Sequence, residues 1–509
     1  MRKLVFFAVA SLAVIVSADV LASVENLGAL QFARADNGVY FAKGIPYAEP
    51  PVGTLRWQEP IDRSFTERAW SASEFGASCM SDLIDPPASS EDCLTLNVWT
   101  PGVASKRPVM VWIHGGAFRW GDGNVPGERL AEEGVVVVSL NYRLGPLGFF
   151  ADPNSDGGVA NFGLLDILSA LRWVQRHIGE FGGDPEKVTI FGISAGAMAV
   201  NLLIANPRAK GLFKRAIAQS GWATWPLWYR RDQLAKAPLF WAGGNVKVAE
   251  QQTAQLLRRA GLSGDESLAQ LRAVEPMRLI DAQSGFQMAI VDGLSIVSEP
   301  GMCFEDRRCR VNGDAYLSGA SSFEGSIMPW TGIKQDQFQS WFVDQARSIE
   351  ATYPHDFSES RELGYRRFFG DLRYLTSAEI SARALHRRGL AVYTYFFDAG
   401  IQLQGDRLLG APHGADSIIF WGDSDKYVGF EALGAQLRRA WVRFATGQSI
   451  AVDRTWRPWR ADQPYWQLLG ARSGDATQSL APRLELIRAL YKQRKRTSQC
   501  VDDLMPDCE

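Results

Sequence analysis

Short apolar segments alternate with longer amphipathic ones along most of this 509-residue chain. Val109–Ile113 and Val135–Leu140 are nearly continuous apolar runs, as expected for strands that are buried on both faces of a sheet. Residues 164–178 follow, with apolar side chains at helical spacing. The pattern continues with expected strands at Val188–Ile193, Arg215–Gln219, Ala315–Leu317 and Ala391–Phe397, and an expected helix at Ala195–Leu203. This alternation predicts an α/β fold with a mostly parallel sheet and helices on both of its faces.

Two long stretches interrupt the alternation, at about residues 221–309 and 325–390. Both contain charged helical sequence, such as Ala249–Ala260 and Ser377–Arg388, and neither is bounded by a linker rich in Pro, Gly or Ser. We therefore expect cap-like insertions over one edge of the sheet within a single domain, residues 23–509, and not independent domains.

The N-terminus has the pattern of a signal peptide. Two basic residues precede the apolar run Leu4–Val16, and small residues follow, with possible cleavage points after Ala18 and Ala22. The run is too short to span a bilayer. We expect residues 1–22 to be removed on export, which predicts a secreted or periplasmic protein.

The charge balance argues against some classes of partner. The formal net charge is -2, and the one basic cluster, Lys492–Arg496, ends an expected helix, where cations suit the helix dipole. We therefore expect no nucleic-acid partner. No later segment is apolar enough for a membrane anchor, and none is expected. The pattern does not indicate an oligomeric state.

An exported chain with six cysteines is expected to form disulfides. Pairing between neighbours is the simplest of the 15 possible connectivities. The pairs would be Cys79 with Cys93, Cys303 with Cys309, and Cys500 with Cys508. No cysteine belongs to a Cys-x-x-Cys motif or to a mixed Cys/His cluster, so we expect neither a metal site nor a cofactor.

The sharpest local signal is the glycine-flanked serine in Gly192-Ile193-Ser194-Ala195-Gly196. A buried strand is expected before this motif and a helix after it, which is the context in which G-x-S-x-G exposes a nucleophile. The turn is so tight that the flanking positions must be tiny. The motif therefore predicts a nucleophilic Ser194 at the edge of the sheet and the start of a helix.

A nucleophilic serine needs donors for the oxyanion that forms when it attacks a carbonyl group. The segment His114–Phe118 directly follows an expected strand and contains two adjacent glycines. Glycines allow backbone N–H groups to approach a substrate closely. We expect the oxyanion donors to be the N–H groups of Gly115, Gly116 and Ala195.

The base that activates Ser194 is expected to be a histidine later in the chain, namely His355, His386 or His413. His386 lies in a charged helical stretch, and His355 lies in a turn-like context inside an insertion. His413 stands in the loop Gly410–Asp416, just past an expected strand, where the catalytic groups of such sheets are found. This placement favours His413.

The acid that orients the histidine has two candidates at strand ends, Glu324 and Asp398. Glu324 is in the loop after the strand Ala315–Leu317. Asp398 belongs to the strand that itself leads to His413, which is one strand too late. Strand order favours Glu324.

Several blocks of this sequence resemble the type-B carboxylesterase family, which includes the cholinesterases and the bacterial p-nitrobenzyl esterases. The blocks occur in the family's order and cover nearly all of the chain after residue 22. They are Phe41–Gly53, Ser90–Asn97, Asn141–Arg143, Phe181–Pro185 and Gln219–Gly221. The resemblance implies the α/β-hydrolase fold, with a central, mostly parallel sheet flanked by helices.

The resemblance also implies particular residue roles. The family's acid is a Glu followed by Gly, which favours Glu324, and its histidine stands in a Gly-x-x-His-Gly block, which favours His413.

Two structural pairs are implied in the same way. They are a Cys79–Cys93 disulfide and a buried ion pair between Glu91 and Arg143.

The chain departs from the family pattern at two positions near the site. Ile193 stands where the family usually has a Glu just before the nucleophile. The histidine block continues with Ala415-Asp416 where a Glu is usual. These changes make a family-style polar network behind Ser194 doubtful, while the expected chemistry is unaffected.

The function implied by the resemblance is hydrolysis of small carboxylic esters through an acyl-enzyme. A lipase, an amidase or a carbamate hydrolase would use the same machinery. A non-catalytic binding protein on this fold would typically lack the nucleophile or the histidine. Four aromatic residues close to the family's acyl pocket could line that pocket or could only pack under the cap: Trp222, Trp225, Trp228 and Tyr229.

Overall fold

The computed structural model describes residues 21–24, 28–63, 70–71, 73–84, 88–238, 246–399, 409–422, 429–450, 456–470 and 472–499. Residues 1–20, which contain most of the expected signal peptide, lie outside this set, as do Cys500 and Cys508.

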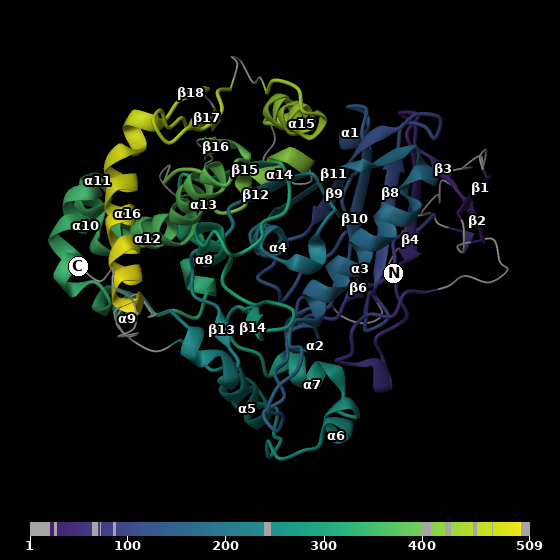
Figure 1. The fold of residues 1–509 in the computed structure, drawn as a ribbon, viewed down its shortest axis with the longest axis horizontal. Coiled ribbons are helices and arrows are strands. Elements are labelled where there is room, and N and C mark those ends of the chain that lie inside the picture. Colours follow the sequence, from purple (N-terminus) through teal and green to yellow (C-terminus); the bar gives the residue numbers. More distant parts are fainter. Residues whose placement is uncertain are drawn as a thin grey trace, which may run out of the picture.

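An 11-stranded sheet runs through the middle of the molecule, with helices on both sides of it (Figure 1). The order is β18-β17-β16-β15-β12-β11-β9-β10-β8-β4-β3. Strands from β17 to β10 in this order are parallel, and antiparallel pairs close both edges. The bounds are β3 Ala33–Arg34, β4 Tyr40–Pro46, β8 Thr95–Thr100, β9 Arg107–Ile113, β10 Val136–Leu140, β11 Gly183–Ile193, β12 Arg215–Gln219, β15 Ala315–Ser321, β16 Ala391–Asp398, β17 Gln467–Gly470 and β18 Gly474–Asp475. The predicted α/β-hydrolase architecture is confirmed.

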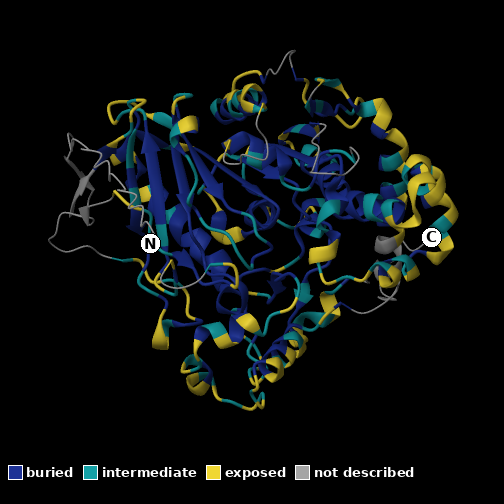
Figure 2. Cartoon of the chain, turned by 180° about the vertical axis from the view of Figure 1, so that it is seen from behind, coloured by how far each residue is buried: buried dark blue, intermediate teal, exposed yellow. Residues whose placement is uncertain are grey.

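The central strands are apolar on both faces because each face packs against its own hydrophobic core. In β9, Val109, Val111 and Ile113 belong to one core, and Met110 and Trp112 belong to the other. Alternate residues of a strand point to opposite faces, so both cores need apolar side chains. The middle of the sheet is accordingly buried (Figure 2). The helices that contribute to the first core include α3 Phe162–His177, α4 Ala195–Ile204, α13 Thr376–Arg387 and α16 Thr477–Gln499, and those of the second include α14 Ala415–Trp421 and α15 Glu431–Thr446.

The two long interruptions of the sequence pattern contain mostly short helices. The first contains β13 Trp228–Tyr229, α5 Ala249–Arg259, α6 Leu268–Arg272, α7 Pro276–Asp281, β14 Ile290–Val291 and α8 Pro300–Glu305. The second contains α9 Gln335–Ser340, α10 Ala346–Thr352, α11 Pro354–Glu359, α12 Arg361–Gly370, a π-helical turn at Asp371–Leu375, and α13. Helix α13 contacts β15 and β16, so this part of the stretch covers the sheet itself.

The implied ion pair between Glu91 and Arg143 is wrong, because each residue has another partner. Arg143 Nη2 lies 2.7 Å from Asp166 Oδ1, and Glu91 Oε1 lies 2.6 Å from Arg56 Nη2. Asp166 is fully buried on α3 and accepts from Nε and Nη2 of Arg143 through both of its oxygens, which makes the pair bidentate. Among the described helices, none is both long and apolar enough to span a membrane.

Candidate active site

Ser194 occupies a sharp turn between β11 and α4. Its backbone has φ 55° and ψ −116°, a conformation that is costly for a residue with a side chain and that persists only when the surroundings enforce it. The enforcement comes from close packing against β9 and the turn after it. A Cβ added to Gly192 would lie 2.5 Å from Ile113 O, and one added to Gly196 would lie 2.0 Å from the same oxygen. Only glycine fits at either position, as the sequence motif requires.

Ser194 Oγ lies 2.8 Å from Nε2 of His413. The other ring nitrogen of His413, Nδ1, contacts Oε2 of Glu324. An ionised carboxylate only accepts hydrogen bonds, so Nδ1 carries the proton that faces Glu324, and Nε2 is left to accept from Ser194. The histidine is also held by its backbone, whose N–H donates to Ser326 Oγ at 2.9 Å, and by its ring, whose centroid lies 4.6 Å from that of Tyr374. Serine, histidine and glutamate therefore form one hydrogen-bonded chain.

The carboxylate of Glu324 is buried and fixed by two further donors. Its Oε1 accepts from the backbone N–H of Ser321 at 2.6 Å and from Ser220 Oγ at 2.5 Å. Sequence reasoning missed Ser220. It follows Gln219 directly in a block noted for its resemblance alone, and its φ of 53° could not be read from the sequence.

The rival candidates lie elsewhere. Asp398 is exposed and accepts from Ser322 Oγ at 2.8 Å. His355 is exposed on α11, and His386 packs its ring against Trp459 with a centroid separation of 5.6 Å. Of the three later histidines, only His413 reaches Ser194.

The loop after β9 brings backbone donors to the serine. A Cβ on Gly115 would lie 3.4 Å from Ser194 Cβ and 2.9 Å from Ile193 O, so this loop packs directly against the turn that carries the serine. Within the described residues, the N–H groups of Gly115, Gly116 and Ala195 donate to no other group. Three free donors beside a serine hydroxyl are suited to bind an oxyanion.

His114, at the start of this loop, is buried and stacks on the ring of Tyr142 with 4.3 Å between centroids. Its Nδ1 lies 2.8 Å from the carbonyl oxygen of Gly115, and its Nε2 is buried without a hydrogen-bond partner among the described residues. Burial disfavours the charged form and lowers the pKa of His114 to about 4, although the Gly115 carbonyl and Asp122 oppose this shift. The ring is therefore neutral at pH 7.

Behind the serine, the position of the usual family Glu is apolar. Ile193 packs into the second hydrophobic core. A carboxylate nevertheless lies nearby: Asp416, in the histidine block, accepts from Tyr395 Oη at 2.6 Å and from Gln219 Nε2 at 3.1 Å. Its complete burial raises the pKa of Asp416. A small polar network is thus present, built on Asp416 rather than on residue 193.

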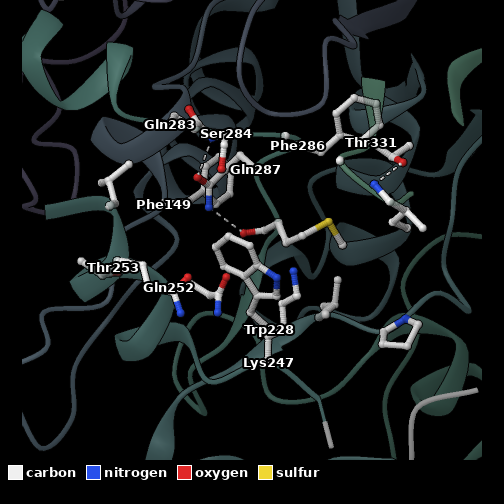
Figure 3. Close-up of a pocket in the computed structure, with 18 of the residues that line it drawn as sticks. Phe149, Trp228, Lys247, Gln252, Thr253, Gln283, Ser284, Phe286, Gln287 and Thr331 are labelled. Atoms are coloured by element: carbon white, nitrogen blue, oxygen red, sulfur yellow. Dashed lines mark hydrogen bonds between the residues drawn. The ribbon is translucent and has the colours of Figure 1, made fainter. Parts of the chain in front are cut away.

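A cavity of about 610 Å³, part of whose lining is drawn in Figure 3, lies beside this site. One of its walls, residues 283–288, is hydrogen-bonded to the segment that follows β9. The N–H of Gln287 donates to Ala117 O at 3.1 Å, and Arg119 Nη1 donates to Gly285 O at 2.9 Å. Ser194 does not itself line the cavity.

Aromatic and polar side chains line this cavity together. Of the four aromatic residues singled out in the sequence, Trp225 and Trp228 line it, and Trp222 and Tyr229 are fully buried side chains that do not. Opposite Trp228, Figure 3 shows the polar side chains of Gln283, Ser284 and Gln287. The cavity is therefore amphipathic, and two of the four aromatic residues pack without lining it.

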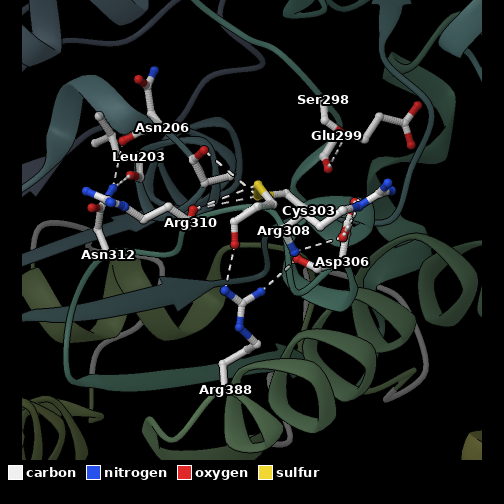
Figure 4. Close-up of a disulfide and its surroundings, with 12 residues drawn as sticks. Leu203, Asn206, Ser298, Glu299, Cys303, Asp306, Arg308, Arg310, Asn312 and Arg388 are labelled. Atoms are coloured by element: carbon white, nitrogen blue, oxygen red, sulfur yellow. Dashed lines mark hydrogen bonds and ion pairs between the residues drawn. A yellow bond between two sulfur atoms is a disulfide. The ribbon is translucent and has the colours of Figure 1, made fainter.

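Two of the three expected cysteine pairs form disulfides, with Cα–Cα distances of 5.0 Å for Cys79–Cys93 and 5.3 Å for Cys303–Cys309. The second loop is tied to α13 by Arg388, which donates to the carbonyl oxygens of Asp306 at 2.8 Å and Cys309 at 2.6 Å (Figure 4). Within the described residues, no group of three or more His, Cys, Asp and Glu side chains could hold a metal ion.

Comparison with known proteins identifies the family. The model of the carboxylesterase family matches residues 27–480. A fumonisin B1 esterase of Sphingopyxis macrogoltabida is 33% identical over 79% of this chain and 78% of its own length, and the para-nitrobenzyl esterase of Bacillus subtilis (strain 168) is 50% identical over 36% of this chain and 41% of its own length. The solved structure of a PNB esterase superposes with a TM-score of 0.76 at 28% identity, covering 92% of this chain and 100% of the other. The chain belongs to the carboxylesterase family and is a carboxylic ester hydrolase.

Proposed function

We propose that the chain is an exported serine esterase in which Ser194, His413 and Glu324 form the catalytic triad. The observation that carries this proposal is the hydrogen-bonded chain from Ser194 Oγ through both ring nitrogens of His413 to Glu324. A nucleophile, a base and an acid in this order are what acyl transfer requires. The two disulfides are consistent with export and with the signal-peptide pattern of residues 1–22.

In the first step, His413 Nε2 takes the proton of Ser194 as Oγ attacks the carbonyl carbon of the ester. The negative charge that develops on the carbonyl oxygen is stabilised by the N–H groups of Gly115, Gly116 and Ala195. The proton held by His413 then passes to the leaving alcohol, and an acyl-serine remains. Glu324 accepts from Nδ1 and so holds the imidazole in the tautomer that exposes a bare Nε2 to Ser194.

In the second step, water attacks the acyl-serine by the same route in reverse. His413 removes a proton from the water, the same donors bind the oxyanion, and the proton returns to Ser194 Oγ as the acid leaves. The substrate is a small-molecule ester, and the reaction needs no cofactor.

The deciding experiment compares Ser194→Ala with wild type. We expect Ser194→Ala to abolish both the hydrolysis of p-nitrophenyl butyrate and covalent labelling by a fluorophosphonate probe, with unchanged thermal unfolding. Ser340→Ala, which removes an exposed serine hydroxyl on α9, is the matched control. Wild-type protein that neither labels nor turns over esters would instead indicate a non-catalytic binding protein.

The acid is tested by comparing Glu324→Gln with Asp398→Asn. In Glu324→Gln the amide oxygen can still accept from Ser220 and Ser321, so the amide N–H₂ faces His413 Nδ1 and favours the wrong tautomer. We expect kcat to fall by about 10,000-fold. Asp398→Asn should keep kcat within a few-fold of wild type, and the opposite ranking would move the acid to Asp398.

A further inference from the structure

Arg373 is a buried cation whose charge is not matched by a carboxylate within the described part of the chain. The residue is 2% exposed, and its Nε and Nη2 are buried without a hydrogen-bond partner in the described residues. An arginine stays charged in proteins, so burying its N–H donors without partners is strongly unfavourable.

Aromatic rings surround the guanidinium. Its Cζ lies 4.8 Å from the ring centroid of Trp222, 4.9 Å from that of Trp225 and 5.7 Å from that of Phe286. Cation–π contacts of this kind stabilise the charge in part. These contacts accept no hydrogen bond from Nε or Nη2 of Arg373, and they do not neutralise its charge. The rings therefore leave the positive charge of Arg373 and two of its N–H donors available to an anion.

The nearest acidic residue along the chain cannot serve as the counterion. Asp371, two residues before Arg373, binds Arg483 with both carboxylate oxygens and also accepts from Tyr353 Oη at 2.8 Å. These contacts hold Asp371 to α16, so its carboxylate does not pair with Arg373.

Arg373 is placed between the cavity and the proposed triad. It lines the cavity of about 610 Å³, and the next residue, Tyr374, packs its ring on His413. Both residues belong to the π-helical turn Asp371–Leu375. Such turns are rare and occur often at functional sites. A group held by Arg373 would therefore belong to a molecule that extends toward Ser194.

The remaining charges of the cavity have the same sign. Lys247 and Arg259 line it with Arg373, and no Asp or Glu is found among its described lining residues. Burial lowers the pKa of Lys247, as expected for a cation that has no nearby carboxylate. A cavity with three cationic side chains and no anionic one favours a negatively charged ligand.

We propose that the preferred substrates are esters that carry a second, ionised carboxylate, and that Arg373 binds this carboxylate while Ser194 attacks the ester carbonyl. The proposal rests on the esterase function proposed above and names its substrate class. The planar fork of a guanidinium matches a carboxylate with two parallel hydrogen bonds, which gives both affinity and orientation.

The test compares monoethyl adipate, which has a free carboxylate, with diethyl adipate, which does not, and follows acid release in a pH-stat. We expect wild-type kcat/KM to be about 10- to 100-fold higher for the monoester, the range given by a charge-assisted bidentate contact. Arg373→Met should abolish or reverse this ratio, and Arg373→Lys, which keeps the charge without the fork, should reduce it. Arg258→Met, which removes an exposed cation of α5 that does not line the cavity, should leave the ratio as in wild type.

A second measurement does not depend on turnover. The Ser194→Ala variant is titrated with adipate dianion by calorimetry. The double variant Ser194→Ala/Arg373→Met is expected to lose this binding. If wild type hydrolyses both esters with equal kcat/KM, or if Arg373→Met leaves the ratio unchanged, the proposal is wrong while the esterase function stands. If no ester is hydrolysed and no probe labels Ser194, the esterase function fails, and the calorimetric result alone then decides whether the cavity binds a carboxylate. Should Arg373→Met fail to fold, Arg373→Lys decides by the same ratio.

Discussion

His114 predicts a specific pH dependence of stability. Its imidazole is buried against Tyr142, and its pKa in the folded chain is about 4, below the ordinary value of 6.5. At pH 7 the ring is neutral in both the folded and the unfolded chain and contributes nothing. Between pH 6.5 and pH 4 the unfolded chain binds a proton that the folded chain does not, so unfolding becomes more favourable as the pH falls.

The size of the effect follows from the two pKa values. A tenfold difference in proton affinity corresponds to about 1.4 kcal/mol, so the free energy of unfolding should fall by about 3 kcal/mol through this group alone by pH 4. The loss should accumulate at up to about 1.4 kcal/mol for each pH unit within the window.

Urea unfolding at half-unit steps from pH 7 to pH 4 measures this slope for wild type and for His114→Phe, which keeps an aromatic ring and cannot take a proton. Any difference in the free energy of unfolding between the two proteins at pH 7 reports packing, and it is subtracted from the differences at lower pH. His355→Gln, which removes an exposed imidazole, should follow the wild-type curve. Parallel curves for wild type and His114→Phe would refute the reasoning, because His114 would then bind its proton equally well in the folded and unfolded chain.

Three further substitutions test the packing around the site. Gly196→Ala should yield little folded protein on expression, because the new Cβ would lie 2.0 Å from the backbone oxygen of Ile113; a soluble, active variant would contradict the tight turn. Asp166→Asn leaves the buried Arg143 without its counter-charge and should lower the free energy of unfolding by about 3–5 kcal/mol in urea, whereas a loss below about 1 kcal/mol would show that the pair is dispensable. Ile193→Glu places a carboxylate in the second hydrophobic core and should cost about 1–3 kcal/mol in the same assay, and an unchanged midpoint would show that this position tolerates the usual family residue.

The sequence predicted the central sheet well, because strands such as Val109–Ile113 are buried on both faces and carry a strong apolar signal. It did not predict the strands nearer the edges, β3, β4, β8, β17 and β18, and it missed the ends of others. Strand β11 begins at Gly183, which pairs with Arg107 ahead of a register shift, and β15 continues to Ser321 through small residues that pair with β16. Pairing of backbone groups across strands sets these ends, and it leaves no trace in hydrophobicity.

The candidate site, too, was predicted from the sequence only in part. Ser194 and His413, 219 residues apart, were predicted to meet because the ends of parallel strands share one edge of the sheet. Their catalytic roles stay predictions. Nothing in the sequence pattern singles out Arg373, since a cation in a charged helical stretch looks like a solvent-exposed residue. Its burial depends on Trp222 and Trp225, which lie about 150 residues earlier in the chain.

The final helix has a consequence for the time course of folding. Arg483 of α16 binds Asp371, which begins the turn that carries Arg373 and Tyr374, and the two partners are 112 residues apart. Before α16 has been synthesised, Asp371 has no cation to bind, and burying its charge would be strongly unfavourable. A nascent chain that already contains Ser194, Glu324 and His413 therefore lacks a finished cavity wall. We therefore expect ester hydrolysis to be acquired only when α16 docks, so incomplete chains should be inactive even though they contain Ser194, Glu324 and His413.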